Sequence, residues 1–147
     1  MADFYASTFV GVKDGTKVPA DRADGRQVRA NECVIVAPKV AAQAYANGDR
    51  LFIGSVRAGE HVREIKVTSD TSFGTTTLSI GTTAAPTKYV NAKTMTVTDV
   101  PTLIGPKATA ADDGPLSADE DIWVTLGVGG IAGGVLFTFE MVLASVA

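Results

Sequence analysis

The stretch that decides the fold is Val135-Leu136-Phe137-Thr138-Phe139-Glu140-Met141-Val142-Leu143. Its apolar side chains at 135, 137, 139, 141 and 143 recur at every second position, while Thr138 and Glu140 share the opposite parity. A repeat of two residues is typical of a β-strand that buries one face. This stretch therefore predicts a half-buried strand.

Shorter runs rich in Thr and Val precede it, separated by turn residues such as Asn47-Gly48-Asp49. They predict strands over 28–36, 50–56, 62–68, 75–80 and 122–126, with a further strand or an irregular stretch over 89–98. The segment 122–126 alternates less strictly, so we expect both faces of this strand to be covered by other parts of the protein. We expect Trp123 to point inward. Only 40–46 favours a helical turn, which Asn47-Gly48 would end. Many short strands with almost no helix predict an all-β, jelly-roll-like β-sandwich.

Two segments fit the strand pattern poorly. Residues 1–27 mix aromatic side chains with a charged stretch, and residues 99–121 combine prolines with acids. We interpret 1–27 as an extended N-terminal arm, 28–147 as a single β-sandwich domain, and 99–121 as a long loop. Arms can add a strand to a neighbour's sheet, and Arg is favoured at interfaces. The predicted contact residues are Phe4, Tyr5, Phe9, Arg22, Arg26 and Arg29.

Composition excludes several function classes. The chain of 147 residues has a net charge of −3, without the basic excess of a general nucleic-acid binder. One Cys excludes an internal disulfide and a Cys-cluster zinc site, and one His excludes most His-based catalysis. The N-terminus has no secretory signal pattern. The apolar run 122–147 is rich in Gly and lacks a basic flank, so we expect strands there and no membrane span.

No residue set predicts catalysis, a metal or a cofactor. His61 stands between Glu60 and Val62 without a second His, and is expected at the surface or at a strand end. Cys33 is expected to be a small buried strand residue. The acids between 112 and 121 lack the spacing of a calcium-binding EF-hand loop and predict a solvated loop. The glycine run 127–130 is followed by a strand pattern, which excludes a dinucleotide-binding loop.

Charge is distributed unevenly along the chain. Residues 1–107 carry all 13 basic residues and ten acids, whereas residues 108–147 carry six acids and no basic residue. The two parts could complement each other within one subunit or between neighbours. A solvated charged surface explains the same distribution, because exposed ion pairs contribute little.

Six short phrases, in this order and spacing, resemble a family of small virion proteins of tailed bacteriophages. The phrases are DGRQVR (24–29), NGDRLFIG (47–54), TSDTSFG (68–74), TLSIGT (77–82), PTKY (86–89) and LSADEDIW (116–123). The resemblance implies a β-sandwich decoration or cement protein on the outside of the phage head, made in the host cytoplasm. It further implies a homotrimer that bridges major capsid subunits and stabilises the shell. The family carries no catalytic, cofactor or metal motif.

Three alternatives stay open at this stage. The first is another virion component, such as a head fibre base or a neck or tail protein. The second is a carbohydrate-binding β-sandwich module, although aromatic residues make up only 7% of the chain and most are expected to point inward. The third is a jelly-roll enzyme, against which the single His weighs.

Overall fold

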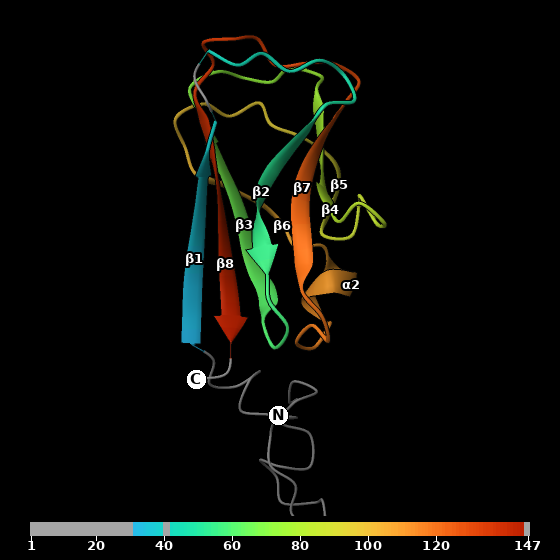
Figure 1. Ribbon diagram of the computed structural model, residues 1–147. Coiled ribbons are helices and arrows are strands. Elements are labelled where there is room, and N and C mark those ends of the chain that lie inside the picture. The colour runs from blue at the N-terminus through green and yellow to red at the C-terminus, as the bar shows by residue number, and fades with distance from the viewer. Residues whose placement is uncertain (1–30, 40–41, 146–147) are drawn as a thin grey trace, which may run out of the picture.

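The protein is a sandwich of two antiparallel sheets, whose strands run from top to bottom in the view of the computed structural model in Figure 1. The structure describes residues 31–39 and 42–145. The strands are β1 (Asn31–Pro38), β2 (Arg50–Val56), β3 (His61–Ser69), β4 (Thr77–Gly81), β5 (Val90–Thr94), β6 (Thr102–Gly105), β7 (Glu120–Gly127) and β8 (Phe137–Ser145). One short helix, α2 (Ala108–Ala111), follows β6. Within the described residues, no helical segment has the length and apolar content that a membrane span requires.

Strand pairing is nested from the ends of the described chain inward. The first sheet has the order β1-β8-β3-β6 and the second has the order β2-β7-β4-β5. Hence β1 pairs with β8, β2 with β7, β3 with β6, and β4 with β5. Eight strands wrapped in this way across two sheets form a jelly roll. The predicted all-β sandwich is therefore confirmed.

The core lies between the sheets, as the sequence alternation of β7 and β8 requires. Ile122, Val124 and Leu126 of β7 are buried, and Phe137, Phe139, Met141 and Leu143 of β8 face them. Phe137 makes edge contacts with Phe73 and Phe139, with ring centroids 5.4 and 5.6 Å apart. Such edge-to-face pairs add to the stabilisation by burial.

One close approach between the sheets depends on glycine. Gly54 has φ +148°, and a Cβ built there would lie 3.0 Å from Ile35 and 3.2 Å from Met141. The strand β2 carries a bulge between Phe52 and Gly54 at this point. The bulge brings the backbone of β2 against the inner face of the first sheet, where a side chain would not fit.

The structure corrects parts of the predicted strand map. Of the predicted helical turn 40–46, residues 40–41 lie outside the described part, and 43–46 form no helix; Tyr45 instead forms an isolated bridge with Ile131. The predicted loop 99–121 contains β6 and α2. β6 was missed because Pro101 and Pro106 flank only four strand residues, too few to show a periodicity.

Candidate interaction surfaces

The predicted contact residues Phe4, Tyr5, Phe9, Arg22, Arg26 and Arg29, and the predicted arm 1–27, lie outside the described residues. The structure does place the point where the chain enters the sandwich. Asn31 opens β1 opposite Ser145 of β8, at the end from which the connections β2–β3, β4–β5 and β6–β7 also leave (Figure 1). We call this the lower end; the opposite end is the upper end.

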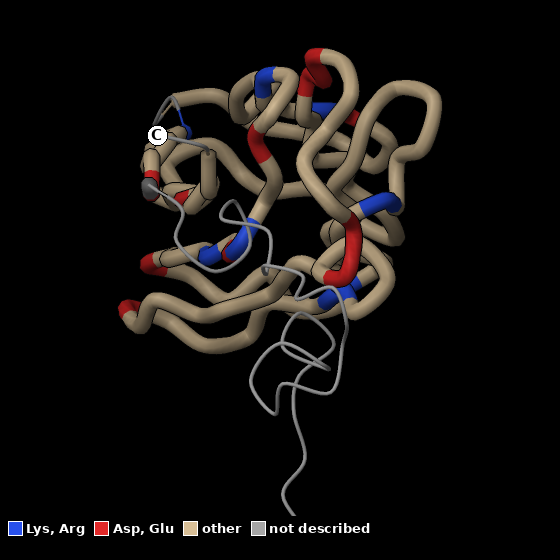
Figure 2. Tube along the Cα trace, turned by 90° about the horizontal axis from the view of Figure 1, so that it is seen from below, with Lys and Arg blue, Asp and Glu red and all other residues tan. Residues whose placement is uncertain are grey.

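The lower end is rich in charge. Figure 2 looks onto it and shows both basic and acidic residues along its loops. The charged residues of its connections 57–60, 82–89 and 106–119 are Arg57, Glu60, Lys88, Lys107, Asp112, Asp113 and Asp119. The described residues of the upper connections carry only Lys39, Asp49, Asp70 and Asp99. The two ends thus differ in the partners that they can attract.

The upper end exposes apolar side chains instead. Val97, Val100, Val128 and Leu136 are 46%, 51%, 71% and 53% exposed. Val128 also has φ +68°, a conformation that a β-branched residue adopts only under strain. A strained and exposed valine at a loop tip contributes nothing to the core.

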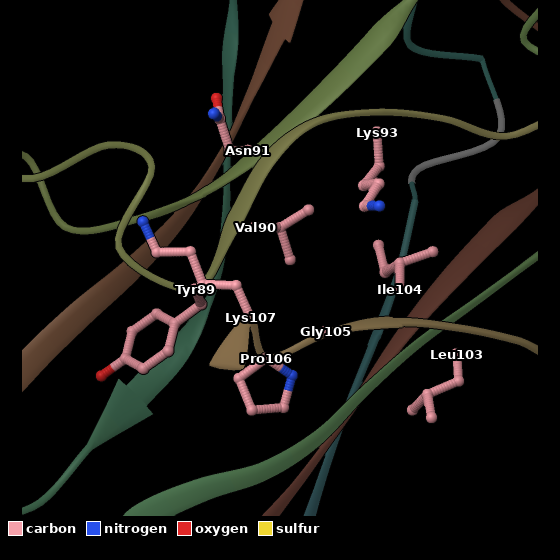
Figure 3. A pocket seen from close by; sticks show the side chains of 9 residues that line it. All are labelled: Tyr89, Val90, Asn91, Lys93, Leu103, Ile104, Gly105, Pro106 and Lys107. Carbon is pink, nitrogen blue, oxygen red and sulfur yellow. The ribbon is translucent and has the colours of Figure 1, made fainter. Parts of the chain in front are cut away.

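A groove opens between the edge strands β5 and β6, where the two sheets part (Figure 3). Its volume is about 490 Å³. Val90 and Ile104 line it, and Leu103 at its rim is 61% exposed. The Lys107 amide donates a 2.7 Å hydrogen bond to the Tyr89 carbonyl and joins the two sides.

Two lysines give the groove its charge. Lys93 of β5 and Lys107 after β6 both line it and are exposed. Neither forms an ion pair with any residue in 31–39 or 42–145. Sequence reasoning did not find this site, because its two walls belong to different sheets. One wall comes from 89–98, predicted as a strand or an irregular stretch, and the other from the predicted loop 99–121.

A polar network closes the lower end beside the groove. The Lys88 Nζ and Glu120 Oε1 atoms are 2.6 Å apart, and the Tyr89 hydroxyl donates a 2.8 Å hydrogen bond to Glu120 Oε2. Burial, and then the bond to the carboxylate, raise the pKa of Tyr89 far above its ordinary value. The network fixes the start of β7 against the β4–β5 connection.

The predicted acidic cluster is divided in its roles. Asp119 accepts a 2.8 Å hydrogen bond from the Ala58 amide, and Asp121 accepts a 2.6 Å bond from the Ser55 hydroxyl. The carboxylates of Asp112 and Asp113 are exposed, without a hydrogen bond or ion pair to another described residue. The described residues hold no group of three or more potential metal ligands.

His61 and Cys33 differ from expectation. His61 does open a strand, as predicted, but it is buried, and its Nδ1 has no hydrogen-bond partner in the described part. Burial, and then the Arg63 guanidinium, lower its pKa. Cys33 is exposed, so the prediction of a buried thiol is wrong: it lies near the start of an edge strand. The central strand β8 separates the two residues.

Trp123 also differs from expectation. It is half-buried on the outer face of the second sheet, opposite Phe52, with ring centroids 5.2 Å apart. The Arg50 guanidinium lies 4.6 Å from the indole centroid and donates to Thr83 Oγ1. Its parity opposite to Ile122 and Val124 was the sequence signal for an outward position.

No family model and no curated protein matches this sequence. Two solved structures contain similar chains. One, from "Capsid of Ralstonia phage GP4", is 16% identical with a TM-score of 0.59. The other, from "Cyanophage Pam1 capsid asymmetric unit", is 13% identical with a TM-score of 0.52. Each alignment covers 80% of this chain and 86% of the other chain. The comparisons show a shared fold.

Proposed function

We propose that this chain is a structural protein of a phage virion that decorates the outside of the head. The likeness to chains of two phage capsid structures over four fifths of this chain carries the proposal. The protein acts by binding and not by catalysis: it bridges neighbouring major capsid subunits and stabilises the shell. Its partners are the major capsid protein and further copies of itself, arranged as a homotrimer.

The lower end supports an orientation on the capsid. The described chain enters β1 there, with Asn31 opposite Ser145. We propose that this end faces the shell and that the arm lies along a neighbouring subunit. Phe4, Tyr5 and Phe9 supply apolar contacts, and Arg22, Arg26 and Arg29 bind carboxylates. Threefold repetition strengthens each weak contact through effective concentration.

Capsids that lack this protein, mixed with purified protein and imaged by electron microscopy, test the proposal. The full chain is expected to add regular density outside the shell and to raise the temperature at which capsids break. Deletion of residues 1–27 is expected to leave a folded β-sandwich, checked by circular dichroism, that no longer stays on capsids. Decoration by the truncated chain at the full-length level would refute the role of the arm. No binding of the full chain would refute the head-decoration proposal and favour another virion position.

The outer-face aromatic pair favours one second candidate, a carbohydrate-binding module. Phe52 is 47% exposed beside Trp123, and aromatic surfaces are suited to partly apolar ligands. Arg50 already covers the indole, which weighs against stacking of a sugar there. Because Trp123 is the sole Trp, its fluorescence reports directly on this patch during titration with oligosaccharides. A saturable change that is lost in Phe52→Ala would support the module.

A further inference from the structure

We propose that the β5–β6 groove binds the acidic turn at Asp112 and Asp113 of a second copy of this chain. The contact is head-to-tail: each subunit offers its groove to one neighbour and its turn to the other. The inference rests on the proposed function in one respect, that the protein works as an assembly of identical subunits. It adds the surfaces that join them.

The groove supplies positive charge over an apolar lining. Lys93 and Lys107 stand on its two walls, and no carboxylate lines it. Leu103 of β6, at 61% exposure, offers an apolar contact at the groove's rim. An acidic loop could form ion pairs with both ammonium groups and at the same time cover the exposed Leu103 side chain.

The turn supplies the matching negative charge. Asp112 ends α2 and Asp113 follows it, and both are exposed. The neighbouring acids differ, since Asp119, Glu120 and Asp121 each bind a group of their own subunit. The acidic turn and the groove are thus complementary surfaces whose charges stay unpaired within the described subunit.

Geometry favours a second copy over closure within one subunit. Helix α2 directly joins Lys107 at the groove to Asp112 at the turn, yet no ion pair forms between the two sites. Two different surfaces that lie next to each other on one subunit make a heterologous contact, which closes into a ring when the rotation allows it. Exposed ion pairs are individually weak, so the contact depends on several acting together and weakens with salt.

A charge-swap series on the full chain tests the contact. Native mass spectrometry and light scattering would measure the oligomeric state of wild type, Lys93→Glu/Lys107→Glu, Asp112→Lys/Asp113→Lys, and the variant with all four changes. We expect wild type to self-associate at low salt. We expect each double variant to raise the dissociation constant at least about tenfold, and the fourfold variant to recover most of this loss. Arg57→Glu/Arg63→Glu reverses two exposed charges outside the groove and should leave self-association unchanged.

The inference would be overturned if wild type were monomeric at low salt, or if the double variants associated like wild type. It would also be overturned if the fourfold variant folded but did not regain self-association. The melting temperature of each variant separates loss of contact from loss of fold. Capsid binding separates this inference from the proposed function. A wild type that decorates capsids but is monomeric in solution at low salt would refute the groove contact alone. A wild type that assembles through the groove but ignores capsids would remove the decoration role alone.

Discussion

Replacing Tyr89 by Phe removes one buried hydroxyl and leaves the ring in place. In the folded protein this hydroxyl donates a 2.8 Å hydrogen bond to Glu120, whose other oxygen binds Lys88 at 2.6 Å. A hydrogen bond to a charged group is worth about 1.5–3 kcal/mol. The Glu120 side chain is 23% exposed, so water can replace part of the lost bond. We therefore expect a loss of about 1.5 kcal/mol, or roughly 3–6 °C in melting temperature.

The same hydroxyl gives the variant a pH signature. The pKa of Tyr89 is raised in the folded state, so the unfolded chain releases this proton first, near its ordinary pKa of about 10. The stability that the hydroxyl contributes is complete below that pH and is lost as the pH rises above it. The difference in unfolding free energy between wild type and Tyr89→Phe should therefore shrink between about pH 9 and 11.

Urea unfolding followed by circular dichroism at several pH values measures both effects. Tyr45→Phe is the matched control, because Tyr45 packs its ring on Phe137 while its hydroxyl bonds to no other described residue. Titration of the remaining groups is common to all three proteins and cancels in the differences. The reasoning about this network would be wrong if Tyr89→Phe and Tyr45→Phe were equally stable at pH 7, and if the difference in unfolding free energy between wild type and Tyr89→Phe did not shrink toward pH 11.

Three further changes test other parts of the fold. Val128→Gly should stabilise the protein by about 0.5–1 kcal/mol in urea unfolding, because it relieves a positive φ at an exposed position; a loss of stability would show that the valine packs. Gly54→Val should destabilise it by more than about 2 kcal/mol through the clash with Ile35, whereas Gly114→Ala, in open space, should have little effect; equal effects would remove the close-approach argument. Wild type should lose stability as the pH falls from about 7 to 5, because His61 is protonated more readily in the unfolded chain than in the folded protein; in His61→Gln this loss should be smaller. An unchanged pH dependence would contradict this role.

The sequence predicted the central strands best, because their packing imposes a strict period. Phe137, Phe139 and Met141 alternate in β8, and Leu78 and Ile80 alternate in β4; all five are buried. Because every second side chain of these strands packs against the opposite sheet, apolar residues recur at every second position of the sequence. The central strand β3, predicted over 62–68, runs over His61–Ser69.

The edges of the sheets were the harder part. Cys33 has the inward parity of its strand, yet it is exposed, because burial at an edge depends on whether the other sheet extends that far. β5 is interrupted by Ala92 at φ +46°, which hides its periodicity. The groove between β5 and β6 exists only through the spacing of two sheets, which no local pattern encodes. Nothing in the sequence could have shown that Lys93 and Lys107 line the same groove.

The nested pairing of β1 with β8 has a consequence for biosynthesis. The two strands lie at opposite ends of the described chain, and β8 occupies the middle of its sheet, between β1 and β3. Until β8 leaves the ribosome, β1 and β3 lack the strand that joins them and present unpaired edges. Such distant pairing slows folding and exposes nascent chains to aggregation. A cell that makes many copies at once therefore faces its greatest hazard in the interval before the eighth strand emerges.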